Sequence, residues 1–128
     1  MGRFFFTRSQ RLLNAAAYTQ VFNNAQAKIS HSAFLILANR AEDPDQQGRL
    51  GLIAAKKNLK RAVQRNAFKR QVRESFRLHQ QQLAGVNIVV MARSGAQNLT
   101  DQAFRAEIDA AWDRLNRRLS RDNAPKTP

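Results

Sequence analysis

The feature that most constrains this chain is a basic stretch over residues 56–77, which reads KKNLKRAVQRNAFKRQVRESFR. It holds nine Lys or Arg residues and a single acid, Glu74. Phe68, Val72 and Phe76 recur in it at four-residue spacing, which places them on one face of a helix. That face has to be covered by another apolar surface, while the cations have to stay in water. The stretch therefore predicts an amphipathic helix that packs on an apolar layer.

The polar side of this helix carries charge of almost one sign. A sector of about 100° beside the apolar face is occupied by Asn66, Lys69, Arg70, Arg73 and Arg77. A merely solvated helix face ordinarily pairs acids with bases three or four residues apart, but here Glu74 is the only acid available. The other cations repel one another, and the phosphates of a bound polyanion would remove that cost.

The residues expected to bind a polyanion are Lys56, Lys57, Arg61, Arg65, Asn66, Lys69, Arg70, Arg73 and Arg77. Arg65 is the exception among them, because it projects onto the apolar side of the wheel near the helix start. There a long side chain can bury its stem and keep its head in water.

The charge of the whole chain also indicates a polyanionic partner. Its 128 residues carry 22 basic and 9 acidic side chains, a formal net charge of +13, and 43% apolar residues supply one core. An anionic membrane surface would need the apolar helix face for lipid, but that face is required for the core. Nucleic acid is therefore favoured. RNA is only weakly favoured over DNA, because no recognition-helix turn precedes the basic stretch.

No segment predicts secretion or a membrane span. The longest apolar run, residues 33–38, is far shorter than the ~20 residues that a span needs. The N-terminal apolar block, residues 4–6, is too short for a signal peptide. Cysteine is absent, which excludes disulfides, thiolate metal sites and cysteine nucleophiles. We expect a cytoplasmic protein.

Periodicity predicts an α+β domain with helices packed on a mixed sheet. The expected elements are a helix over residues 14–24, strands over 29–40 and 49–57, the basic helix over 62–83, a strand over 86–93 and a helix over 101–119. The first two strands should pair as a hairpin across the turn at 41–48, and the apolar strand at 86–93 should be central. Gly85 is expected to end the basic helix and Thr100 to cap the last one.

These elements divide the chain into three segments. Residues 1–11 are expected to be an irregular basic arm, residues 12–119 a single RNA-binding domain, and residues 120–128 a disordered polar tail. The three consecutive phenylalanines of the arm, residues 4–6, fit either packing on the domain or stacking on RNA.

The sequence offers no convincing catalytic or metal-binding group. His31 and His79 are the only histidines, and they fall on different predicted elements. On the last helix, Glu107 and Asp109 point about 160° apart, so they cannot converge on one metal ion. We therefore expect no catalytic residue and no metal site in the chain itself.

The basic stretch and its neighbours resemble the protein subunit of bacterial ribonuclease P over residues 49–93. The resemblance is carried by Gly51-Leu52, Lys56-Lys57, Ala62, Arg65-Asn66, Lys69-Arg70, Arg73-Glu74, Phe76-Arg77 and Ala92-Arg93. Upstream, Tyr18 and Phe22 are similar to the aromatic pair of the family's first helix. One position departs from the pattern, since the family's Arg-Asn-Arg triplet appears here as Arg65-Asn66-Ala67. Position 67 lies outside the cationic sector, so the missing arginine should weaken RNA binding without abolishing it.

The resemblance implies a fold similar to the second domain of ribosomal protein S5, with a left-handed crossover through the basic helix. General rules alone would predict a right-handed crossover. It also implies that the basic helix contacts a catalytic RNA subunit, while a cleft between the first helix and the sheet holds the 5′ leader of precursor tRNA. The residues expected to line that cleft are Tyr18, Phe22 and Phe34, with core packing as the competing role of each.

The implied function is that of the protein component of an endoribonuclease that removes the 5′ leader from precursor tRNA. Magnesium-dependent cleavage would belong to the RNA subunit, so Mg²⁺ would act through that subunit rather than through protein ligands. The implied partners are the catalytic RNA and precursor tRNA, with no protein partner and no membrane. A structural RNA-binding protein such as a ribosomal component is the alternative, and an architectural DNA binder is a third.

Overall fold

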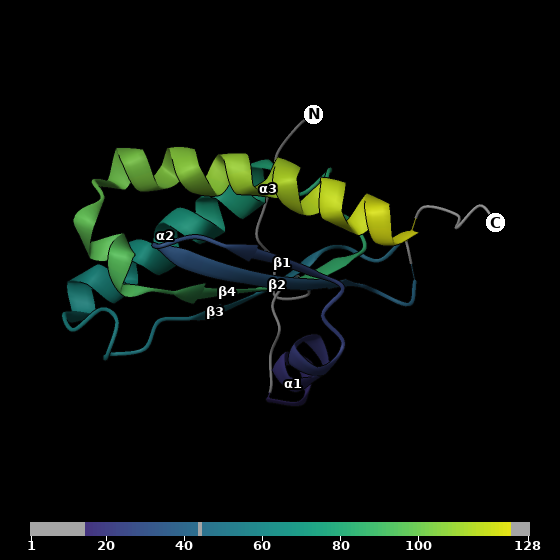
Figure 1. Ribbon diagram of the computed structural model, residues 1–128, viewed down its shortest axis with the longest axis horizontal. Helices are drawn as coiled ribbons and strands as arrows, with labels where there is room; N and C mark the ends of the chain where they lie inside the picture. Colours follow the sequence, from purple (N-terminus) through teal and green to yellow (C-terminus); the bar gives the residue numbers. More distant parts are fainter. Residues whose placement is uncertain (1–14, 44, 124–128) are drawn as a thin grey trace.

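The computed structural model describes residues 15–43 and 45–123, and it shows one mixed sheet covered by helices on both faces (Figure 1). The elements are α1 (Ala15–Asn23), β1 (Ala27–Ser30), β2 (Phe34–Arg40), β3 (Arg49–Ile53), α2 (Ala62–Leu78), β4 (Val86–Ala92), the 3₁₀ helix η2 (Ser94–Asn98) and α3 (Asp101–Asn123). Helices α2 and α3 lie on one face of the sheet, and α1 lies on the other. The predicted α+β class is confirmed.

The strand order is β1-β2-β4-β3, which makes the predicted hairpin between residues 29–40 and 49–57 wrong. Strand β4 lies between them, antiparallel to β2 and parallel to β3. The reason is burial, because Ile88 and Val89 are both 0% exposed on opposite faces of β4. The most apolar strand takes the central position, as predicted, and the connection at 41–48 has to pass it.

The single strand predicted over residues 29–40 is two strands. β1 and β2 pair antiparallel, with Ile29 opposite Ile36, and the polar residues between them form the turn. The backbone N–H of His31 donates to the carbonyl of Phe34 (2.9 Å), and His31 Nδ1 accepts the N–H of Ala33 (3.0 Å). The His31 side chain thus supports the turn that breaks the apolar run.

Alternation along the strands divides the core between the two faces of the sheet. Ile36, Ile88 and Leu50 face α2 and α3, where they pack with Trp112. Val89 faces α1 and packs with Val21. Trp112 is 0% exposed, so its predicted role in the core is confirmed.

Helix α2 ends at Leu78, earlier than the predicted residue 83. The N–H of His79 is shared between the carbonyls of Ser75 and Phe76, a tightening that closes the helix. Gly85 instead turns the chain into β4 with a positive φ of 73°, and its N–H donates to the carbonyl of Gln46 (2.7 Å).

Helix α3 begins as predicted and ends later. Thr100 Oγ1 accepts the N–H of Ala103 (3.0 Å), which confirms the predicted cap. The helix continues through Asn123, so the expectation of a disordered tail is wrong for residues 120–123. Residues 124–128 and the arm at 1–11 lie outside the described residues, as does Asn14, the expected first residue of α1.

Strands β3 and β4 are parallel neighbours joined through α2, which makes this connection a crossover. Its left-handed sense stays a prediction of the resemblance. Within residues 15–43 and 45–123, no helix has the length and apolar character to cross a membrane.

A buried hydroxyl joins α2 to α3. Ser75, 0% exposed, accepts a hydrogen bond from Trp112 Nε1 (2.7 Å) and donates one to Asp109 Oδ1. Replacing Ser75 by Ala should cost about 1–3 kcal/mol in the free energy of unfolding, because the indole N–H and the carboxylate would lose their partner. Urea unfolding measures this, with the exposed Ser120→Ala as control. Equal stability of the two variants would contradict the assignment.

Candidate nucleic-acid interface

The cationic flank of α2, defined as Asn66, Lys69, Arg70, Arg73 and Arg77, lies on the side of α2 opposite Phe68 and Gln71, with Arg70 near the first residue of α3. On the other side of α2, Phe68 packs against Phe104 with ring centroids 5.5 Å apart, and Gln71 accepts a hydrogen bond from Arg105 (3.3 Å). Since α3 covers that side and the sheet lies beneath the apolar face, the cationic flank looks out past the edge strand β3. The packing of α3 and the sheet on α2 therefore separates its apolar face from its cationic flank.

The members of the flank differ in exposure. Asn66, Arg70 and Arg73 are exposed, whereas Lys69 and Arg77 are half-buried. Within the described part of the chain, the carboxylate recorded near Arg70 is that of Asp101, at 3.9 Å, with both side chains well exposed. An ion pair of this length at the surface contributes little, so Arg70 can exchange Asp101 for a phosphate.

Arg65 has a different setting from the other predicted cations. Its Nη1 donates to the carbonyls of Leu59 and Lys60, both at 2.9 Å. The guanidinium therefore closes the loop that leads into α2. Arg65 is also the predicted cation that projects onto the apolar side of the helix. Its contact with RNA stays a prediction.

The loop from β3 to α2 adds exposed cations beside the flank. Lys56, Lys57 and Arg61 are exposed there. Asn58 Nδ2 donates to the carbonyl of Ala92 (2.9 Å) and so ties the loop to the end of β4. The exposed cations of this loop thus come directly before the helix that carries the cationic flank.

Glu74 is held by Arg77. The side-chain hydrogen bond from Arg77 lowers the pKa of Glu74 below its ordinary 4.5; desolvation opposes this effect, and the charges of Arg77 and Arg105 add to it. A lowered folded-state pKa favours folding above the ordinary carboxyl range, and this contribution is lost as pH falls through the lowered pKa.

Glu74→Gln should therefore lower the free energy of unfolding at pH 7. In acid the difference from the original chain should disappear, because the original chain loses the contribution of ionised Glu74 while glutamine does not titrate. The effect should be small because both side chains are partly exposed. Urea unfolding of the variant and the original chain at pH 7 and at about pH 3 measures it. A stability difference that is the same at both values would contradict the proposed linkage.

On the other face of the sheet, Tyr18 of α1 lies over Gly51 of β3. A Cβ atom at position 51 would come within 2.6 Å of Tyr18 Cε1, so glycine is required for this contact. The hydroxyl of Tyr18 accepts the N–H of Leu52 (3.1 Å), which belongs to the edge strand β3. Phe22 is 41% exposed, a large exposed fraction for a phenylalanine on a packed helix. Two of the three predicted aromatics are thus on the α1 face.

Phe34 is not on that face, and its predicted place in the cleft is wrong. It is 0% exposed on the side of α2 and α3, stacked on His31 (4.6 Å) and edge-on to Phe104 (5.9 Å). The family resemblance implied Phe34 as a third ring for stacking on unpaired bases. The strand alternation, which places neighbouring residues on opposite faces, was the signal that points to Leu35 instead.

Three half-buried apolar residues on the α1 face escaped the sequence reasoning. Leu35, Met91 and Ile53 lie side by side in the register of β2, β4 and β3. On its own strand, each lies two residues from a residue that α1 covers, namely Leu37, Val89 or Gly51. Residues two apart on a strand point to the same face of the sheet, so all three lie on the α1 face. We call them the apolar strip. Together with Tyr18 and Phe22, it gives the α1 face aromatic and apolar surface beside the edge strand β3.

Comparison with known proteins decides the family. A sequence model of the family described as Ribonuclease P matches residues 6–116, most of the chain. The chain belongs to the ribonuclease P protein family. A ribonuclease P protein component of Marinomonas sp. is 46% identical over 115 residues, covering 90% of this chain and 86% of that protein. One of Pseudomonas aeruginosa is 42% identical over 120 residues, covering 94% and 87%.

Solved structures of ribonuclease P proteins share the fold. The protein of Staphylococcus aureus superposes with a TM-score of 0.72 at 23% identity, covering 88% of this chain and 93% of that one. That of Thermotoga maritima gives a TM-score of 0.65 at 24% identity, covering 84% and 96%. At these identities the likeness establishes the fold alone.

In this ribonuclease P family member, the acids and histidines of the described residues do not gather into a metal site. No three His, Asp or Glu side chains in residues 15–43 and 45–123 are placed to hold a metal ion. His31 Nε2 instead lies 3.2 Å from Glu107 Oε2, and Asp109 pairs with Arg105 (3.2 Å). These contacts join the turn between β1 and β2 to α3 and stabilise α3.

Proposed function

We propose that this chain binds the catalytic RNA subunit of ribonuclease P through the cationic flank of α2 and the neighbouring loop. The observation that carries the proposal is that the flank lies on the side of α2 opposite the one that packs on α3, with Asn66, Arg70 and Arg73 exposed and Glu74 as the acid paired within α2. Arginine predominates there, and its planar guanidinium suits bidentate contact with phosphate. RNA phosphates would relieve the repulsion among these cations.

The α1 face is proposed to bind the 5′ leader of precursor tRNA. Tyr18 and Phe22 offer ring surface to unpaired bases, and the apolar strip of Leu35, Met91 and Ile53 lies on the same face. This surface is separate from the cationic flank, because α1 and α2 lie on opposite faces of the sheet (Figure 1). Strand β3 borders both, so one protein could hold the RNA subunit and the leader at the same edge.

Phosphodiester cleavage is assigned to the RNA subunit, together with the Mg²⁺ on which it depends. The protein contributes positive charge and substrate positioning, which promote endonucleolytic 5′ maturation of tRNA. This assignment rests on the family to which the chain belongs.

Reconstitution tests the proposed function. The chain alone should leave precursor tRNA uncut, and adding it to a bacterial ribonuclease P RNA at low magnesium should restore removal of the leader. A chain that binds this RNA without any gain in cleavage would contradict the proposal. Co-purification of ribosomal RNA instead of one structured RNA of a few hundred nucleotides would favour a structural RNA-binding protein.

A further inference from the structure

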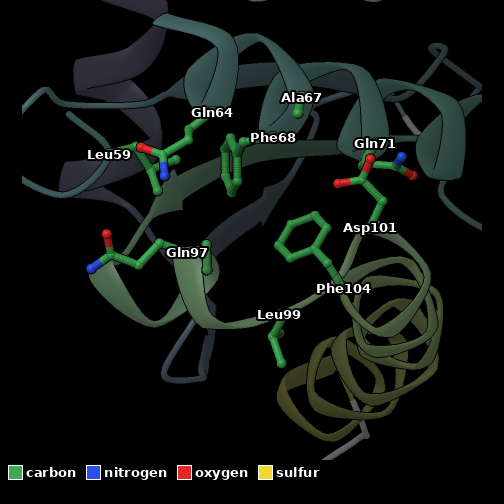
Figure 2. Close-up of a pocket in the computed structure, with 10 residues that line it drawn as sticks. Leu59, Gln64, Ala67, Phe68, Gln71, Gln97, Leu99, Asp101 and Phe104 are labelled. Atoms are coloured by element: carbon green, nitrogen blue, oxygen red, sulfur yellow. The ribbon is translucent and has the colours of Figure 1, made fainter. Parts of the chain in front are cut away.

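A pocket of about 120 Å³ lies between the first half of α2 and the segment that leads from η2 into α3 (Figure 2). Its apolar wall contains Leu59, Phe68 and Phe104, which are buried, and Leu99. Its polar wall contains Gln64, Gln71, Gln97 and Asp101. Ligand pockets for drug-sized molecules measure about 300–1,000 Å³, so this one admits a single small ring system.

The polar wall presents both donors and an acceptor. Gln64 Oε1 accepts the backbone N–H of Arg61 (3.2 Å), and Gln71 Oε1 accepts Arg105 Nη1 (3.3 Å). With their oxygens engaged, the two amides have N–H groups to offer a ligand. The carboxylate of Asp101 is well exposed, and its separation from Arg70 is long, at 3.9 Å. It can therefore still accept hydrogen bonds from a ligand.

We propose that this pocket takes the base of one unpaired guanine in the RNA bound to α2, an inference that rests on the proposed RNA binding. Guanine carries two adjacent donors, N1–H and the N2 amino group, which one carboxylate can accept together. Its O6 and N7 are acceptors for amide N–H groups. Adenine, cytosine and uracil lack the adjacent donor pair. Phe68 and Phe104 supply the apolar surface against which the ring would pack.

The pocket favours a base within RNA over a free guanine nucleotide. Its lining holds no Lys or Arg that could bind the phosphates of a nucleotide. The recorded cation at its rim is Arg70, which belongs to the cationic flank and faces Asp101. An RNA backbone on the flank can therefore keep its phosphate at Arg70 and turn one base inward. Position 67, where the chain departs from the family's Arg-Asn-Arg triplet, lines the same pocket.

Short RNAs test the proposal without the catalytic RNA. Single-stranded UUGUU should bind the protein about tenfold more tightly than UUIUU, whose inosine lacks the N2 amino donor to Asp101. NMR titration should show the ring signals of Phe68 and Phe104 shifting with UUGUU. Guanosine monophosphate should bind more weakly than UUGUU. Equal affinity for the two pentamers, or tighter binding of the mononucleotide, would overturn the proposal.

Two substitutions localise the effect. Ala67→Leu fills the pocket without a change of charge, and Asp101→Asn removes the acceptor pair; both should abolish the preference for UUGUU over UUIUU. Ala110→Leu, at an exposed alanine of α3 outside the pocket, should keep it. A preference that survives Ala67→Leu would overturn the site. If the unchanged protein shows no preference for UUGUU but supports normal reconstituted cleavage, the pocket proposal alone is wrong. Failed cleavage with an intact preference would contradict only the proposed function.

Discussion

Replacing Lys69 and Arg73 together by Ala is expected to weaken binding to the catalytic RNA and to reduce the slope of log affinity against log salt by about two units. Both residues belong to the cationic flank, where Arg73 is exposed and Lys69 is half-buried. Each phosphate contact that is lost removes about one released counterion, so the effect should grow as salt is lowered. Filter binding or fluorescence anisotropy over a salt series measures it.

The matched control removes the same charge from another surface. Arg117 and Arg118 are exposed on α3, and Arg117→Ala with Arg118→Ala lowers the net charge by the same two units. The control should leave a salt slope closer to that of the unchanged protein. If both double variants reduced the slope equally, binding would depend on total charge, and the flank would lose its special role.

Replacing Tyr18 and Phe22 by Ala is expected to spare binding to the RNA subunit and to reduce the preference for precursor over mature tRNA by at least about tenfold. The reason is that stacking of a base on an aromatic ring is worth about 1–3 kcal/mol, and 1.4 kcal/mol is a factor of ten. Affinities of the reconstituted complex for the two tRNA forms measure the preference.

Two further variants separate stacking from stability. Tyr18→Phe keeps the ring over Gly51 but removes the acceptor for the Leu52 N–H, so it should retain the preference while losing some stability. Leu78→Ala removes a comparably exposed apolar side chain from α2, 47% against 41% for Phe22, and should leave the preference intact. A loss of preference in Leu78→Ala would show that the α1 face is not the leader site.

Features that depend on neighbours in sequence were predicted well. The spacing of Phe68, Val72 and Phe76 places all three residues in the core, and Thr100 caps α3. The cationic flank occupies one side of α2 because a helix repeats every 3.6 residues, whatever it packs against. The central place of β4 also follows from its own composition, since an apolar strand is buried on both faces.

Features that depend on distant contacts were not predicted. The pairing of β3 with β4 rather than β2 is decided across the whole sheet, and the hairpin that the turn at 41–48 suggests does not form. The face on which Phe34 lies depends on where β1 ends and β2 begins, which His31 and its turn decide. The pocket beside Ala67 exists only because η2 and the start of α3 come to lie against α2.

The sequence by itself determined that the helical part of residues 56–77 has one apolar and one cationic side, because that pattern is local and periodic. Only the tertiary structure decided which way the cations look. Helix α3 covers the side of α2 that carries Phe68 and Gln71, so the cationic flank looks past β3, while the edge of β3 also receives the hydroxyl of Tyr18 from the opposite face. Burial of apolar surface against α3 and the sheet is the physical reason, since it leaves a single direction in which these charges can remain in water.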